Sequence, residues 1–127
     1  MFGKKQQPPS FRVDLAQPVW FFLIEVRVTG NMVQPWIAGS TALVQAFVPC
    51  MKLEDALRLL DEYLVTQELV RIDTVRAERH LPDDEYDELP ADYMREPLEQ
   101  ASQSNECKLG IFVVSRETAW PKDEMVQ

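Results

Sequence analysis

The sequence predicts a single α+β domain with a small four-stranded sheet, mixed or antiparallel, and one amphipathic helix on one face. At 127 residues the chain has the length of one domain. Its hydrophobic fraction of 46% and charged fraction of 27% are typical of soluble globular domains. Short apolar runs typical of strands alternate with one segment of helical spacing. Ferredoxin-like arrangements are one topology among several that fit.

The chain is expected to divide into three parts. Residues 1–18 contain three prolines and few periodic apolar positions, so they read as a loose N-terminal arm along the domain. Residues 19–120 form the domain, which carries an acidic insertion at 82–100. Residues 121–127 form a flexible tail.

The first two strands are expected in WFFLIEVRV (20–28) and TALVQAFVP (41–49). In the first, the even-numbered residues are all apolar, while the odd-numbered face passes from Phe21 and Leu23 to Glu25 and Arg27. This alternation predicts a half-buried strand. The second is apolar on both faces, as a central strand covered by a helix would be.

The helix is expected in KLEDALRLLDEYL (52–64), where apolar residues recur at steps of three and four and acids occupy the first turn. ELVRIDTVRAER (68–79) reads as a solvent-facing or edge strand. KLGIFVVSR (108–116) gives a fourth strand that is apolar on both faces. Between them, a short helix from about residue 91 to 101 fits the pattern, although Pro97 is a poor interior residue.

The net charge of -8 argues against nucleic acid or an anionic membrane surface as partner, because both require a basic face. The longest apolar run, residues 19–24, is too short to span a bilayer, and the opening residues lack the apolar core of a secretory signal. Two cysteines are too few for a disulfide framework, although the sequence is compatible with a single disulfide bond between them. We therefore expect a cytoplasmic protein.

Nearly all of the net charge lies in one stretch, residues 82–100, called the acidic segment below. Between residues 83 and 99 it holds eight acids against one base, Arg95. Apolar and aromatic residues recur among these charges: Leu81, Tyr86, Leu89, Tyr93, Met94 and Leu98. Aromatic residues and methionine are enriched at interfaces, and the surrounding carboxylates favour a partner of opposite sign.

The acidic segment therefore predicts a docking surface for a basic protein, and the chain reads as a non-enzymatic binding module. An inhibitor or immunity-type protein and a small regulatory subunit are two narrower forms of this hypothesis. The other interpretation has the aromatics packed back onto the sheet while the acids face water. The residues expected to contact the partner are Asp83, Asp84, Glu85, Tyr86, Asp87, Glu88, Asp92, Tyr93 and Glu96.

Catalysis has weaker support in the sequence. Cys50 precedes the expected helix, whose dipole would favour a thiolate, and His80 is the one histidine that could act as base. A thiol-dependent enzyme or redox protein using Cys50 is the alternative function. A third option is a small-ligand-binding domain with Trp20 or Trp36 at its pocket.

No cofactor or metal site is expected. DDEYDE (83–88) lacks the ligand spacing and central glycine of a calcium-binding EF-hand loop. One histidine and two separated cysteines do not make a zinc site, and the four glycines do not form a phosphate-binding loop. A second copy of the chain is a further candidate partner, which would pair with this one through the exposed third strand.

Overall fold

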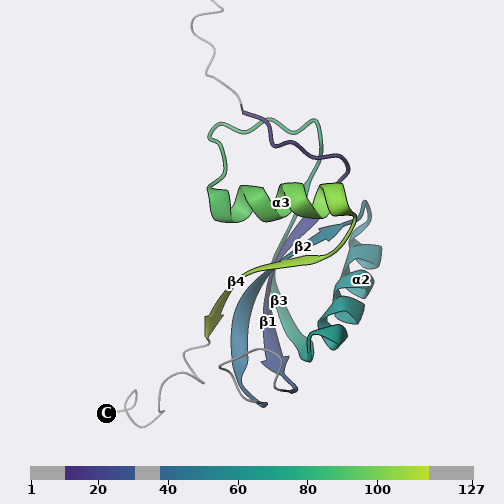
Figure 1. The fold of residues 1–127 in the computed structure, drawn as a ribbon, viewed down its shortest axis with the longest axis vertical. Helices are drawn as coiled ribbons and strands as arrows, with labels where there is room; N and C mark the ends of the chain where they lie inside the picture. The colour runs from purple at the N-terminus through teal and green to yellow at the C-terminus, as the bar shows by residue number, and fades with distance from the viewer. Residues whose placement is uncertain (1–10, 31–37, 115–127) are drawn as a thin grey trace, which may run out of the picture.

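A computed structural model describes residues 11–30 and 38–114, with the side chains of Val113 and Val114 excepted. The elements follow the chain in the order β1 (Val19–Val28), β2 (Thr41–Pro49), α2 (Leu53–Thr66), β3 (Leu69–His80), α3 (Asp92–Ser104) and β4 (Lys108–Val114) (Figure 1). The fold is α+β with a small sheet, as the sequence predicts. The first ten residues, Trp36 and the expected tail at 121–127 lie outside the described residues.

All four strands belong to one antiparallel sheet with the order β3-β1-β2-β4. The two strands richest in apolar residues, β1 and β2, occupy the centre, and β3 lies at an edge of the described sheet. Two register shifts interrupt the pairing of β1 with β3. Bulges of this kind twist a strand and make its outer edge harder to pair.

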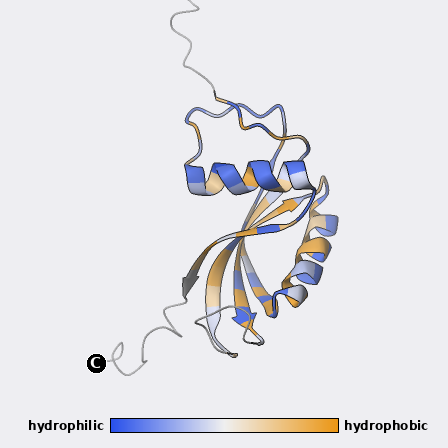
Figure 2. Cartoon of the chain, in the orientation of Figure 1, coloured by the Kyte–Doolittle hydropathy of each residue, from blue (hydrophilic) through white to orange (hydrophobic). Residues whose placement is uncertain are grey.

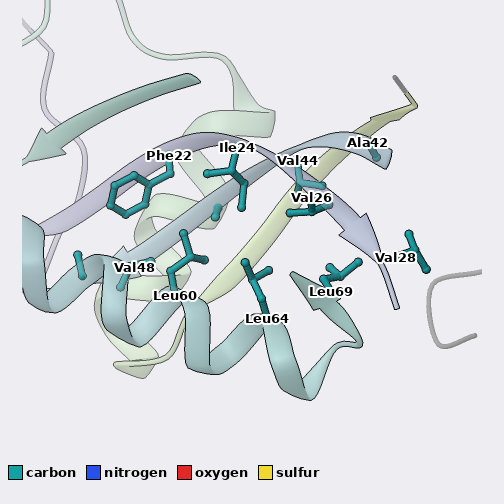
Figure 3. Packing of buried hydrophobic residues seen from close by; sticks show 12 residues of the cluster. Phe22, Ile24, Val26, Val28, Ala42, Val44, Val48, Leu60, Leu64 and Leu69 are labelled. Carbon is teal, nitrogen blue, oxygen red and sulfur yellow. The ribbon is translucent and has the colours of Figure 1, made fainter. Parts of the chain in front are cut away.

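Helix α2 covers one face of the sheet because its apolar stripe meets the even-numbered side chains of β1 and β2. Ala56, Leu60 and Leu64 of α2 are fully buried against these strands. Figure 3 shows Leu60 and Leu64 pointing toward Phe22, Ile24 and Val26. Arg71 of β3 also donates to both carboxylate oxygens of Asp61 in α2, at 2.8 and 2.9 Å.

Helix α3 lies on the opposite face and crosses it near one end of the strands (Figure 1). Its buried residues Leu98 and Ala101 pack with Val19, Phe21 and Phe47, which point away from α2. The fold class predicted from the sequence has one helix on one face, whereas the structure has a helix on each face; the short helix expected at about 91–101 corresponds to α3. Figure 2 shows α3 coloured mostly hydrophilic, which agrees with the narrow stripe it buries.

Pro97 lies inside α3 without ending it. Proline lacks the N–H that would bond the carbonyl four residues earlier, which belongs to Tyr93. Tyr93 lies in the first turn of α3 and is exposed. The helix ends at Asn105, which adopts the left-handed conformation (φ 59°) and donates its N–H to the Ala101 carbonyl.

Candidate functional site

The described part of the N-terminal arm, residues 11–18, lies along the acidic segment and α3. Phe11 and Tyr86 exchange two backbone hydrogen bonds, at 2.8 and 2.9 Å. Val13 and Leu15 are buried in the same cluster as Leu98 of α3. The arm therefore supplies part of the core beneath the acidic segment.

Polar contacts fix the arm at several further points. Arg12 forms an ion pair with Glu85 (3.0 Å), and the Asp14 N–H donates to Glu99 (3.1 Å). Ser102, the buried polar residue of α3, accepts the Ala16 N–H at its hydroxyl oxygen and receives the Gln17 amide at its carbonyl. These contacts hold the acidic segment at both of its ends.

His80 and Tyr86 form the contact that joins the end of β3 to the acidic segment. Nδ1 of His80 lies 2.6 Å from the Tyr86 hydroxyl, and the two rings stack with centroids 5.8 Å apart. Burial lowers the pKa of His80, with the charges of Glu78 and Asp84 opposing the shift. Burial raises the pKa of Tyr86 to about 12, and the charges of Asp84 and Glu78 add to it.

The carboxylates of the acidic segment fall into two groups. One group has internal partners. Asp84 accepts the Leu81 N–H at 2.8 Å, and Glu99 accepts the Asp14 N–H. Glu85 forms an ion pair with Arg12, and Asp92 forms one with Arg95. The other group faces water. Within the described residues Asp83, Asp87 and Glu88 form no hydrogen bond or ion pair, and Glu96 is likewise exposed. The first group shapes the segment and the second supplies its free charge.

The apolar residues of the acidic segment divide in the same way. Leu98 is fully buried, and Tyr86 and Met94 pack partly against the same cluster. Leu89 and Tyr93 remain exposed, at 45% and 55%. The segment's aromatic residues therefore differ in exposure: Tyr86 packs partly onto the domain, while Tyr93 stays accessible among the acids.

A cavity of about 250 Å³ opens where α3 meets the sheet, and we call it the α3–sheet cavity. Three strands and the first turn of α3 line it: Phe21 and Leu23, Gln45, Arg76 and Glu78, and Tyr93 and Met94. The Glu78 side chain in this lining has two partners: one carboxylate oxygen accepts the N–H of Arg76 Nε at 2.7 Å, and the other lies 3.7 Å from His80 Nε2. The cavity thus adjoins the His80–Tyr86 contact.

A second cavity, of about 320 Å³, lies beneath the arm and is lined by Arg12, Val13, Asp14, Leu15 and Pro82. Four of its five residues belong to the arm itself. Arg12 and Asp14 already have partners in Glu85 and Glu99. This cavity presents no convergent set of free polar groups.

The structure does not bring Cys50 and His80 together. Cys50 follows β2 and His80 ends β3, with β1 between these strands, so roughly 10 Å of sheet separates them at ordinary strand spacing. His80 contacts Tyr86 and Glu78 instead. Cys50 is half-buried, and its thiol donates to the Lys52 carbonyl at 3.6 Å.

Cys107 also lies as a free thiol, packed partly against the α2 side of the core. Burial raises the pKa of the Cys107 thiol to about 11, with a smaller contribution from the charge of Cys50. A thiol with so high a pKa is a poor nucleophile near neutral pH.

Trp20 stacks on Phe22, with centroids 5.8 Å apart, and its indole N–H donates to the Met51 carbonyl. It lines neither of the two cavities described above. Among the residues that the structure describes, no group of three or more His, Cys, Asp or Glu side chains is arranged to hold a metal ion. None of the described helices combines the length and apolar character needed to cross a membrane.

Sequence reasoning missed the residues of β1 and β3 that line the α3–sheet cavity, chiefly Leu23, Arg76 and Glu78. One signal was present, because Phe21 and Leu23 place apolar groups on the odd-numbered face of β1 that α2 leaves uncovered. Comparison of the chain with protein-family models, with curated proteins and with solved structures finds no match.

Proposed function

We propose that this chain is a non-enzymatic protein-binding module that docks a basic partner through its acidic segment. The observation that carries the proposal is that, among the described residues, some carboxylates of the segment have partners within the chain while others have none. Glu85 and Glu99 tie the segment to the arm, while Asp83, Asp87 and Glu88 keep their charge free for an external cation. An inhibitor that covers a basic groove and a small regulatory subunit are two forms of such a module.

The packing of the acidic segment supports the proposal on energetic grounds. A segment that must be ordered on binding reduces the affinity by the entropy of that ordering. Here the paired backbone of Phe11 and Tyr86, the buried Leu98 and the His80–Tyr86 contact hold the segment before any partner arrives. Leu89 and Tyr93 add exposed apolar area beside the free acids.

The test neutralises only the acids without internal partners. The triple variant Asp83→Asn, Asp87→Asn and Glu88→Gln should retain the fold and lose the proteins that the native chain captures from lysate of the source organism. A matched control carries Glu54→Gln, Asp55→Asn and Glu62→Gln on exposed positions of α2, where ion pairs with Arg58 are worth little. The control should capture the same proteins as the native chain.

Salt dependence provides the second readout. Capture through exposed charges should weaken as ionic strength rises, because salt screens interactions beyond about 8 Å at 0.15 M. If the triple variant, the control and the native chain all retain the same proteins at every salt concentration, the acidic segment does not dock a partner and the proposal is wrong.

A further inference from the structure

The α3–sheet cavity is built from two neighbouring rows of residues on the face that α3 partly covers. In one row Leu23 pairs with Gln45 on one side and Arg76 on the other. In the next row Phe21 pairs with Phe47 and Glu78. Residues directly opposite in an antiparallel pair point to the same side of the sheet. The first turn of α3 then closes one wall with Tyr93 and Met94.

The size of the cavity suits one side chain. Pockets for small molecules commonly measure about 300–1,000 Å³, whereas this cavity measures about 250 Å³. It also opens beside the acidic segment, since Tyr93 belongs to both. An occupant contributed by a docked protein therefore fits the cavity better than a free metabolite.

The lining selects for a long side chain with a cationic end. Phe21, Leu23 and Met94 offer apolar surface to a hydrocarbon stem, and Tyr93 presents an aromatic ring that is 55% exposed. Glu78 provides a carboxylate in the lining. The chain's own Arg76 demonstrates that a guanidinium fits beside Glu78, with Nε 2.7 Å from the carboxylate.

The adjacent row of the same face adds negative charge. Glu25 and Asp73 lie directly opposite each other on β1 and β3, and in the described part of the chain neither forms an ion pair. Like charges in this arrangement repel each other and destabilise the pair of strands. A cation bound nearby would relieve that repulsion, so the open face favours cationic over anionic occupants.

We infer that the α3–sheet cavity receives a single arginine side chain from the basic partner, stacked on Tyr93 and paired with Glu78. The inference rests on the proposed function, which supplies the partner. Arginine fits better than lysine because its planar guanidinium can stack on the ring and bond a carboxylate through two N–H groups at once. Binding requires Arg76, whose side chain is 63% exposed, to exchange its ion pair with Glu78 for contact with water.

The test compares oligoarginine and oligolysine peptides of equal length, which carry the same charge. Binding is followed by fluorescence anisotropy, and the site by NMR shifts of the Leu23 and Met94 methyl groups. The native chain should bind oligoarginine about fivefold more tightly than oligolysine, a difference of about 1 kcal/mol typical of a cation–π contact. The two methyl groups should shift with oligoarginine.

Three variants test the cavity without relying on a single fold-sensitive change. Tyr93→Leu alters an exposed residue and should reduce the preference for arginine to less than twofold, as should Glu78→Gln. Arg76→Gln removes the internal competitor and should raise the affinity for oligoarginine more than that for oligolysine. Val65→Ala, which alters an exposed residue of α2 outside both the cavity and the acidic segment, should leave the preference unchanged.

The outcomes separate this inference from the proposed function. If both peptides bind equally, or if Tyr93→Leu and Glu78→Gln leave the preference intact, the arginine site is refuted. The proposed function then stands as long as the triple variant of Asp83, Asp87 and Glu88 weakens both peptides. If neither peptide binds at millimolar concentration, or if the triple variant binds both as the native chain does, the proposed function fails too.

Discussion

The Tyr86 hydroxyl lies 2.6 Å from Nδ1 of His80, and through this contact the acidic segment is joined to the end of β3. The same tyrosine pairs its backbone with Phe11 of the arm. His80 in turn lies beside Glu78, which lines the α3–sheet cavity. One small cluster therefore connects the distant N-terminal arm with the end of β3 and the acidic segment that follows it.

Removing the hydroxyl of Tyr86 should destabilise the domain slightly. Tyr86→Phe deletes the bond to His80 and should lower the free energy of unfolding by about 0.5–1.5 kcal/mol, the usual contribution of one hydrogen bond. Urea denaturation followed by circular dichroism measures it. Tyr93→Phe is the control, because that residue is exposed and its hydroxyl forms no bond within the described residues. Equal stability of both variants would contradict the role of the contact.

His80 should make the stability depend on pH below neutrality. Its pKa is lowered in the folded chain from the usual 6.5, so between the two values the unfolded chain binds the proton more tightly. The stability contributed by neutral His80 is then full above about pH 6.5 and is lost as the pH falls through the folded pKa. Unfolding free energies of the native chain and His80→Gln, measured from pH 5 to 8, should differ in slope in that range. Parallel curves would show that His80 does not titrate in this way.

The two thiols should differ in reactivity. With a pKa of about 11, Cys107 carries about a hundredfold less thiolate at pH 8 than a thiol at the reference value of 9.0. Iodoacetamide labelling of the native chain, read by mass spectrometry of peptides, should therefore modify Cys50 well before Cys107. Labelling in urea is the control, since unfolding should make the two rates similar. Faster labelling of Cys107 in the native chain would overturn this ranking.

The sheet and α2 could be predicted from the sequence because their signals are local. The period-two pattern of residues 19–28 and the three-and-four spacing of residues 53–64 depend on neighbours within each element. The edge position of β3 also follows from its own polar residues. Such patterns can be recognised without knowing how distant segments meet.

The arrangement of the site could not be predicted, because it depends on contacts between distant parts of the chain. The arm reaches the acidic segment through Phe11 and Tyr86, which lie 75 positions apart in sequence. The register of β1 with β3 places Arg76 beside Leu23, and two shifts then interrupt it. The composition of a single strand predicts neither its pairing partner nor the position of a bulge. Tyr93 could be named as a contact residue, whereas the cavity beside it could not.

Leu98 should be the residue on which the position of the acidic segment most depends. It is fully buried between α3 and the strand face formed by Val19, Phe21 and Phe47, so Leu98→Ala leaves a cavity and should cost about 2–5 kcal/mol. Because the core between α2 and the sheet does not include Leu98, amides of α3 and residues 82–91 should lose hydrogen-exchange protection before those of β1 and β2. Leu89→Ala, at an exposed position, should change neither the stability nor the exchange pattern. Uniform loss of protection throughout the sheet would instead mean that α3 and the sheet unfold as one unit, in which case the docking surface is as stable as the domain itself.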